Sequence, residues 1–315
     1  MYQGLYLPEG ALLDTEANQA ALSSLSALTV AMENRTVLEG CVVLCDASHN
    51  LVVQVGEYRG IIPRVEAAIG IESGTTREIA VISRVGKPVA FHITGIETDV
   101  NGNTNLLLSR KSAQKEALKH YLNTLQVGDI LPAKVTHLEP FGAFVDIGCG
   151  NIALIGIENL SVSRISHPKD RLAVGQAIYA AVRQVDAEAE RITLTQRELL
   201  GTWAQNAAKF EVGQTVRGIV RGIEEYGIFV ELTPNLSGLA EKRDGLEEGD
   251  AVSVYIKNIT EEKMKIKLIV IDVCGKSQNT VITQADYFIT DGHLDCWEYS
   301  PPDCEKKKIR TCFED

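Results

Sequence analysis

Hydrophobic and polar positions alternate most clearly in the middle of the chain, within residues 130–148. Residues 130–136 are rich in β-forming side chains and follow a Gly-Asp turn. Further along, Val145 and Ile147 fall on one face of an extended strand, while Phe144 and Asp146 fall on the other. A period of two is typical of a half-buried strand. The pattern therefore predicts two β-strands, with one face of the second in a core.

Two phenylalanine rings stand at the start of the second strand. Phe141 precedes Phe144 by three residues, so a regular strand would place the rings on opposite faces. A glycine bulge at Gly142 would bring both rings to the same face. On the outside of a small twisted sheet, two rings would form a platform on which unpaired bases stack. The alternative is that both rings lie in the core, where large aromatic side chains are common.

The same pattern returns later in the chain. The unit aromatic-Gly-x-Phe-Val-acid occurs at residues 141–146 and again at residues 226–231, with Tyr226 and Phe229 as its rings. Many sets of side chains can satisfy a core. Reuse of one aromatic spacing therefore favours a function for the rings, although common descent would also preserve it.

The spacing of β patterns and turns predicts three β-rich units joined by short helical connectors. Five short strands in so few residues suit a small closed Greek-key barrel of the OB type. We therefore expect a mainly β protein with three tandem five-stranded barrels, an N-terminal helix and a C-terminal β extension. The expected segments are a leader (1–34), a first unit (35–112), a connector (113–125), a second unit (126–200), a connector (201–210), a third unit (211–273) and an extension (274–315).

The leader is expected to be one amphipathic helix capped by Asp14 or Thr15. Its apolar positions share one face at helical spacing: Ala21, Leu25, Leu28 and Met32. Packing on the first unit is the favoured role, because amphipathic helices mostly face their own core. The other role is to dock a partner.

Composition bounds the class of protein. The chain has 315 residues, of which 45% are hydrophobic and 23% charged, as in soluble globular proteins. No apolar run is long enough for a membrane span, and Met1–Gly10 has no signal-peptide pattern, so we expect a cytoplasmic location and no membrane partner. The net charge of −11 argues against broad binding to duplex nucleic acid. Single-strand binding stays open, since stacking supplies part of its affinity.

No motif indicates an enzyme, a metal site or a cofactor. A nucleophile elbow and a paired-histidine metal motif are both missing. The seven cysteines are expected to be reduced thiols, and those near the C-terminus lack the short spacing of zinc sites. Residues 287–290 and 297–302 are expected to form strands that lie against the third barrel.

The second unit, residues 127–195, resembles the S1 domain, the RNA-binding OB barrel of bacterial ribosomal protein S1 and its relatives. The run Phe-Gly-Ala-Phe-Val-Asp is specific for this family. The third unit is similar over residues 212–268. The first is similar in strand order and ending, but residues 49–53 read His-Asn-Leu-Val-Val where the paired aromatics belong.

The resemblance implies an RNA-binding face made of two strand aromatics, a turn histidine and an acid/arginine pair. Gly156 and Ala240 stand near the place of the turn histidine, so that group is missing from both units. In the third unit, Thr260 replaces the acid. The basic residues would meet phosphates. The residues implied are Phe141, Phe144, Lys134, Asp186 and Arg191 in the second unit and Tyr226, Phe229, Arg217 and Lys265 in the third.

Two functions are therefore expected as alternatives. The first is binding of single-stranded RNA, mRNA in particular, within the translation apparatus, with the leader and the first unit contacting the small ribosomal subunit. The second is an S1-domain scaffold for protein contacts, or an accessory factor in RNA turnover, that is not stably on the ribosome.

Overall fold

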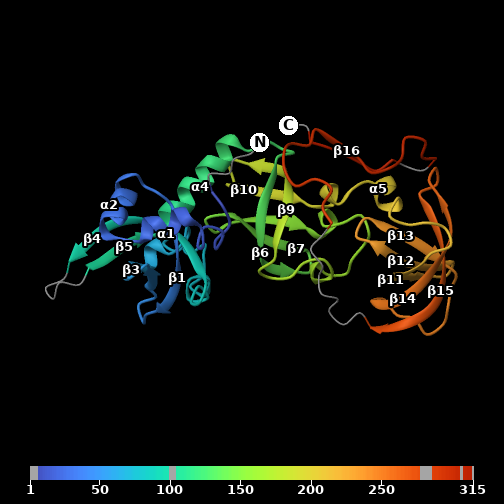
Figure 1. The fold of residues 1–315 in the computed structure, drawn as a ribbon, viewed down its shortest axis with the longest axis horizontal. Helices are drawn as coiled ribbons and strands as arrows, with labels where there is room; N and C mark the ends of the chain where they lie inside the picture. Colours follow the sequence, from blue (N-terminus) through green and yellow to red (C-terminus); the bar gives the residue numbers. More distant parts are fainter. Residues whose placement is uncertain (1–5, 99–103, 277–285, 306–307, 314–315) are drawn as a thin grey trace.

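The computed structural model describes residues 6–98, 104–276, 286–305 and 308–313. Three closed barrels of five strands, numbered 1 to 3 in chain order, lie in a row, and barrel 2 lies in the middle (Figure 1). The fold class predicted from the sequence is confirmed. All three barrels share one topology, in which the third and fifth strands pair in parallel and every other neighbouring pair is antiparallel.

Each barrel has a core of its own, built from alternate positions of its strands, with Phe91, Val145 and Val230 as fully buried examples. Barrel 1 consists of β1 (Leu38–Cys45), β2 (Leu51–Val55), β3 (Tyr58–Ile62), β4 (Pro88–Thr98) and β5 (Thr104–Ser109), with the short helices η1 (Arg64–Glu66) and α3 (Ile79–Ile82) between β3 and β4. Barrel 2 consists of β6 (Ile130–Glu139), β7 (Gly142–Gly148), β8 (Asn151–Gly156), β9 (Ala177–Asp186) and β10 (Arg191–Thr195), with η2 (Ile157–Asn159) and η3 (Pro168–Asp170). Barrel 3 consists of β11 (Thr215–Glu224), β12 (Gly227–Thr233), β13 (Leu236–Ala240), β14 (Asp250–Thr260) and β15 (Lys265–Lys276).

Two helices, α1 (Glu16–Leu22) and α2 (Leu25–Glu33), replace the single leader helix that the sequence predicts. The side chain of Thr15 caps α1, and Ser24 caps α2, which separates the two helices. Leu28 is fully buried in the core of barrel 1, whereas Leu25 is exposed. The leader thus packs on barrel 1.

The start of the described chain lies against barrel 2 before the leader helices reach barrel 1. The Cys149 N–H donates to the Leu7 carbonyl at 2.9 Å, and the Tyr121 hydroxyl donates to the Tyr6 carbonyl at 2.8 Å. Tyr121 belongs to α4 (Arg110–Thr124), the helix that connects the two barrels. The leader therefore bridges barrels 1 and 2.

The C-terminal segment runs back from barrel 3 across barrel 2 (Figure 1). The Ile130 N–H donates to the Gly292 carbonyl and the Leu294 N–H to the Gly128 carbonyl, both at 3.0 Å. Contrary to the sequence prediction, residues 287–290 form no strand, and Tyr287 packs on Tyr179 of barrel 2 rather than on barrel 3. This segment has few alternating apolar positions, so its place depends on tertiary contacts.

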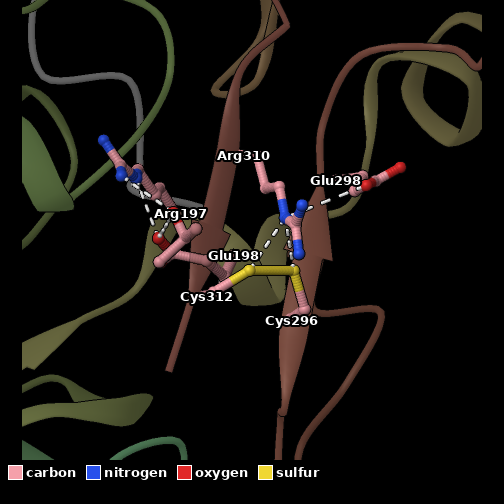
Figure 2. The surroundings of a disulfide bond; sticks show 7 residues. Arg197, Glu198, Cys296, Glu298, Arg310 and Cys312 are labelled. Atoms are coloured by element: carbon pink, nitrogen blue, oxygen red, sulfur yellow. Dashed lines mark hydrogen bonds and ion pairs between the residues drawn. A yellow bond between two sulfur atoms is a disulfide. The ribbon is translucent and has the colours of Figure 1, made fainter. Parts of the chain in front are cut away.

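A short hairpin closes the described chain, made of β16 (Cys296–Glu298) and β17 (Arg310–Cys312). Cys296 and Cys312 are partners in this sheet and form a disulfide, so the expectation of seven reduced thiols was wrong for these two (Figure 2). Arg310 Nε donates to both sulfurs, at 2.9 and 2.8 Å. On the opposite face, Thr311 donates to the buried carboxylate of Glu198 at 2.8 Å. The hairpin packs beside the connector made of η4 (Arg197–Leu200) and α5 (Trp203–Ala207).

Candidate nucleic-acid interface

The two rings of barrel 2 lie outside its core. Phe141, in the turn before β7, is 57% exposed, and Phe144 on β7 is partly exposed. Their centroids are 5.9 Å apart and their planes meet at 90°, an edge-to-face contact. Core positions on β7 are taken instead by Ala143 and Val145, both fully buried. The rings thus form an aromatic patch on the surface.

The glycine between the rings has a different role from the predicted one. β7 pairs regularly from Gly142 to Asp146, and the bulge lies on the neighbouring strand β6, between Val135 and His137. A Cβ at Gly142 would lie 2.4 Å from the Ile155 carbonyl oxygen, and one at Gly227 of barrel 3 would lie 2.5 Å from the Ala240 carbonyl oxygen. Only glycine fits at these points, because a neighbouring strand backbone approaches so closely. Phe141 shares the face of Phe144 because it precedes the strand.

The bulge brings a third ring to the patch, which the sequence analysis missed. His137 pairs with Phe144 across β6 and β7, and their rings are stacked with centroids 6.2 Å apart and planes at 28°. The His137 side chain is 62% exposed, and its Nε2 lies 2.7 Å from the Glu139 carboxylate. Strict alternation from Val135 would put residue 137 inside the barrel. The extra residue at the bulge turns it outward.

Barrel 3 repeats the pair but lacks the third ring. Tyr226 is 69% and Phe229 36% exposed, with centroids 6.1 Å apart and planes at 88°. Gly222 pairs with Phe229 where His137 pairs with Phe144. Phe229 pairs with Leu239 of β13, and Leu239 pairs with Lys267 of β15. Lys267 is exposed, and the sequence did not predict it as a site residue. Two strand spacings, about 10 Å, separate Phe229 from Lys267.

The acid/arginine pair lies at the turn between β9 and β10. Asp186 and Arg191 face each other across the two strands, and the Asp186 carboxylate accepts the Ala189 N–H at 2.9 Å. Arg191 is exposed. It shares an outward face of β10 with Thr193. Thr193 pairs with Leu154 of β8, and Leu154 pairs with Phe144 of β7. In barrel 3, the corresponding Lys265 is partly buried opposite Thr260 and shares its face with Lys267.

The remaining two predicted cations, Lys134 and Arg217, have other neighbours in the structure. Lys134 Nζ donates to the Glu9 carbonyl at 2.9 Å, so the ammonium group is engaged by the leader. Arg217 is exposed on β11, where it pairs with Ser253 of β14 rather than with the strand that carries Phe229.

The acid two residues after the second ring ties each barrel to the part of the chain before it. In barrel 2, the buried Asp146 accepts the Glu9 N–H at 2.7 Å and the Gly148 and Gly150 N–H groups at 2.8 and 2.9 Å. Glu9 in turn forms an ion pair with Arg110 at 2.6 Å. Burial opposes ionisation of Glu9, but this guanidinium holds the pKa of Glu9 below its usual range.

In barrel 3, the corresponding acid is Glu231. Its carboxylate is buried and binds Arg171 of barrel 2 at 2.5 Å and Arg221 at 2.9 Å. Arg221 also reaches Asp170 at 3.4 Å. Because Glu231 lies on the strand that presents Phe229, this ion-pair network relates the ring patch of barrel 3 to barrel 2.

Within the described residues, no cluster of three or more histidine, cysteine or acidic side chains could hold a metal ion. No helix among them is long and apolar enough to cross a membrane.

Comparison with known proteins gives three similarities. Residues 124–197 match the S1 RNA binding domain. Small ribosomal subunit protein bS1 of Staphylococcus aureus (strain MRSA252) is 28% identical over 315 residues, 95% of this chain and 75% of that protein. The small ribosomal subunit protein bS1 homolog of Bacillus subtilis (strain 168) is 34% identical over 236 residues, 69% of this chain and 58% of that protein.

Among solved structures, a multidomain protein with nucleic acid binding domains from Streptococcus pneumoniae TIGR4 is 16% identical. The match covers 76% of this chain and 74% of that one, with a TM-score of 0.26.

Proposed function

We propose that this S1-like chain, which carries an S1 RNA-binding domain and is similar to bacterial ribosomal protein S1 over most of its length, binds single-stranded RNA, mRNA in particular, in the translation apparatus. One observation carries the proposal. Two barrels in series present an exposed edge-to-face ring pair at the same place, Phe141 with Phe144 and Tyr226 with Phe229. Exposed rings accept the faces of unpaired bases, and each stacked base contributes about 1–3 kcal/mol.

Basic side chains on the same outward faces would supply the phosphate contacts. Arg191 in barrel 2 and Lys265 in barrel 3 keep this proposed role, with Asp186 orienting the turn beside Arg191, and Lys267 joins them. Arg217 would act at the edge of barrel 3. Lys134 has no such role in the proposal, since its ammonium group already binds the Glu9 carbonyl. A few local cations suffice in a chain of net charge −11, because stacking carries part of the affinity.

The two patches would act together on one strand of RNA. Each barrel alone has only two or three rings, so its own affinity is expected to be modest. Holding the second site near the first raises its effective concentration, which can strengthen binding by about 10²–10⁴ without a new contact. The ion pairs of Glu231 with Arg171 and Arg221 would limit how far the two patches can separate.

Barrel 1 favours a protein partner instead. Residues Leu44, Val52, Ile61 and Leu107 form one row across its strands, with Leu44 54% exposed and the other three partly exposed. An aliphatic row without rings cannot stack bases, but it can bury apolar area in a protein interface. The proposal assigns this barrel and the leader to contacts with the small ribosomal subunit, and the whole protein to a non-catalytic role in the cytoplasm. We also propose that the domains of the protein follow the boundaries predicted from the sequence.

Anisotropy titration of an unstructured fluorescent RNA at two salt concentrations tests this function. Replacing Phe141, Phe144, Tyr226 and Phe229 by alanine should weaken binding roughly 10³-fold, the loss of about 4 kcal/mol of stacking from the two ring pairs. The matched control replaces Val174 and Val212, which are 64% and 57% exposed, by alanine. Circular dichroism should show the same fold for both variants. Equal affinities of the ring variant and the control would contradict the proposal.

A further inference from the structure

A second cationic surface lies on α4, the connector between barrels 1 and 2, and includes none of the ring residues. It is a pocket of about 500 Å³ at α4. Four cationic side chains line it together with two carboxylates: Arg35, Lys111, Lys115 and Lys119 with Glu66 and Glu116. Arg35 follows helix α2, and Glu66 lies on η1, so the pocket is formed where leader, barrel 1 and connector meet.

The carboxylates of the pocket already have partners. Arg35 Nη2 lies 3.3 Å from Glu116 Oε2, and Lys111 Nζ lies 3.6 Å from Glu66 Oε1 and also binds Glu72. By contrast, Lys115 and Lys119 are exposed and form no ion pair within the part of the chain that the structure describes. Of the six charged residues that line the pocket, four are positive and two negative; with Glu72, which binds Lys111, one positive charge remains in excess.

The lysines are unfavourable for the helix that carries them. Lys111, Lys115 and Lys119 are spaced four residues apart, and like charges at this spacing destabilise a helix. The first turn of α4 has no acidic residue, so Lys111 also opposes the helix macrodipole. The other face of α4 is buried, with Ala113 and Ala117 fully covered. A bound anion would offset both costs on the exposed face.

We propose that this pocket binds phosphate groups of the same single-stranded RNA, and this inference rests on the proposed function. The lining has no aromatic side chain, so it would contact the RNA backbone and not the bases. Its volume exceeds that of one phosphate, which suits a phosphodiester with its neighbouring sugars. Barrel 1 would then take part in RNA binding through its connector, although its strand face has no ring pair.

Amine footprinting on the unaltered protein tests this directly. The protein is saturated with unstructured RNA, treated briefly with an acylating reagent and analysed by mass spectrometry. Lys115 and Lys119 should be protected relative to the free protein. Lys87 and Lys308, exposed residues of barrel 1 and the C-terminal segment, should react equally in both samples. Unchanged reaction of Lys115 and Lys119 in RNA-saturated protein would overturn the inference.

Salt dependence gives a second measurement. Lys115→Gln with Lys119→Gln should lower the slope of log affinity against log salt by about 1.4, or 0.7 for each lost phosphate contact. Lys87→Gln with Lys308→Gln removes the same charge and should leave the slope unchanged. A slope equal to that of the control would contradict phosphate binding at the pocket and would leave the proposed stacking on the rings unaffected. If the parent binds no RNA, the proposed function itself fails.

Inorganic phosphate separates an RNA site from a site for a free anion. At equal phosphate concentration and ionic strength, unstructured RNA should stabilise the parent more than inorganic phosphate does, and this excess should be smaller in the Lys115→Gln, Lys119→Gln variant. An excess over inorganic phosphate that is the same in the parent and the variant would mean that the pocket takes a free anion, and would overturn its assignment to RNA.

Discussion

Barrel 1 and barrels 2 and 3 share one topology and differ on the outward face. In each barrel, the strand register defines one row of side chains that crosses the sheet at the same level. In barrel 2 the row is His137, Phe144, Leu154 and Thr193; in barrel 3 it is Gly222, Phe229, Leu239 and Lys267; in barrel 1 it is Leu44, Val52, Ile61 and Leu107. The inward positions of all three are apolar and buried. The fold therefore depends on the inward positions, and the outward row is free to differ in chemistry.

The same comparison separates two roles within the repeated motif. Asp146 in barrel 2 and Glu231 in barrel 3 are buried in contacts with preceding segments of the chain. The matching residue of barrel 1 is Gln54, which is exposed and hydrogen-bonds only within its own hairpin among the described residues. The rings of the motif thus face solvent, while its acid holds a preceding segment of the chain, the leader in barrel 2 and a loop of barrel 2 in barrel 3.

The largest effect is expected at this joint. Glu231→Ala leaves the buried guanidinium group of Arg171 without this carboxylate and that of Arg221 with Asp170 alone, which should cost about 3–5 kcal/mol. Gln54→Ala, at the matching exposed position, should change stability by about 0.5 kcal/mol or less. Both tryptophans, Trp203 and Trp297, lie in the core of barrel 3, so urea unfolding followed by tryptophan fluorescence reports on this barrel. Similar losses for the two variants would refute the distinction between them.

Removing one ring pair should have the next largest effect, on RNA affinity rather than on stability. Phe141→Ala with Phe144→Ala should weaken binding by about 2 kcal/mol or more, roughly 30-fold. Val52→Ala, at the Phe144 position of barrel 1, should leave RNA affinity unchanged. The check is an anisotropy titration at fixed salt. If Val52→Ala weakened RNA affinity as much as the ring variant does, the strand face of barrel 1 would also contact bases, contrary to this comparison.

A pH effect is expected where the leader meets barrel 1. Burial raises the pKa of Glu39 to about 7, although its carboxylate accepts the Gly10 and Leu12 N–H groups at 3.0 Å. A raised pKa means that the folded protein binds the proton more tightly than the unfolded chain. The associated stability is present below about pH 4.5 and is lost as pH rises through 7.

Glu39→Gln removes this titration, so its stability relative to the parent should rise between pH 5 and pH 8. The change should be about 1–2 kcal/mol after allowance for solvent screening. Thermal denaturation of both proteins at the two pH values measures it. A difference between the proteins that stays constant or falls with pH would contradict the assignment.

The smallest effect concerns the third ring. His137→Ala should weaken RNA binding by about 1 kcal/mol, roughly fivefold. Conversely, Gly222→His should strengthen binding by barrel 3, because a Cβ at Gly222 meets only the Phe229 ring, at 3.9 Å, and has room. The two variants are compared with their parent in the same anisotropy titration. If both leave affinity unchanged, the ring of His137 takes no part.

The repeated motif and the three barrels could be predicted from the sequence because they depend on local patterns. Alternation along β7 separates Val145 from Phe144, and turns delimit each strand. Recurrence of the motif then marks the rings as candidates. These features need no knowledge of which strand pairs with which.

Other features depend on register and on contacts between distant segments. His137 turns outward only because of a bulge that alternation does not reveal. The contact of the Lys134 ammonium group with the Glu9 carbonyl joins residues far apart in the chain, so the sequence does not reveal it. One partner of Glu231, Arg171, lies in another barrel. Cys296 and Cys312 meet only because β16 and β17 pair.

Photo-crosslinking tests the central claim most directly, that barrels 2 and 3 stack bases on exposed rings while the strand face of barrel 1 does not. RNA containing 4-thiouridine is bound to the intact protein, irradiated and mapped by mass spectrometry. Crosslinks should fall on the peptides with Phe141, Phe144, Tyr226 and Phe229, and the peptide with Val52 should carry none. Crosslinks concentrated on the Val52 peptide, with none on the ring peptides, would contradict the account.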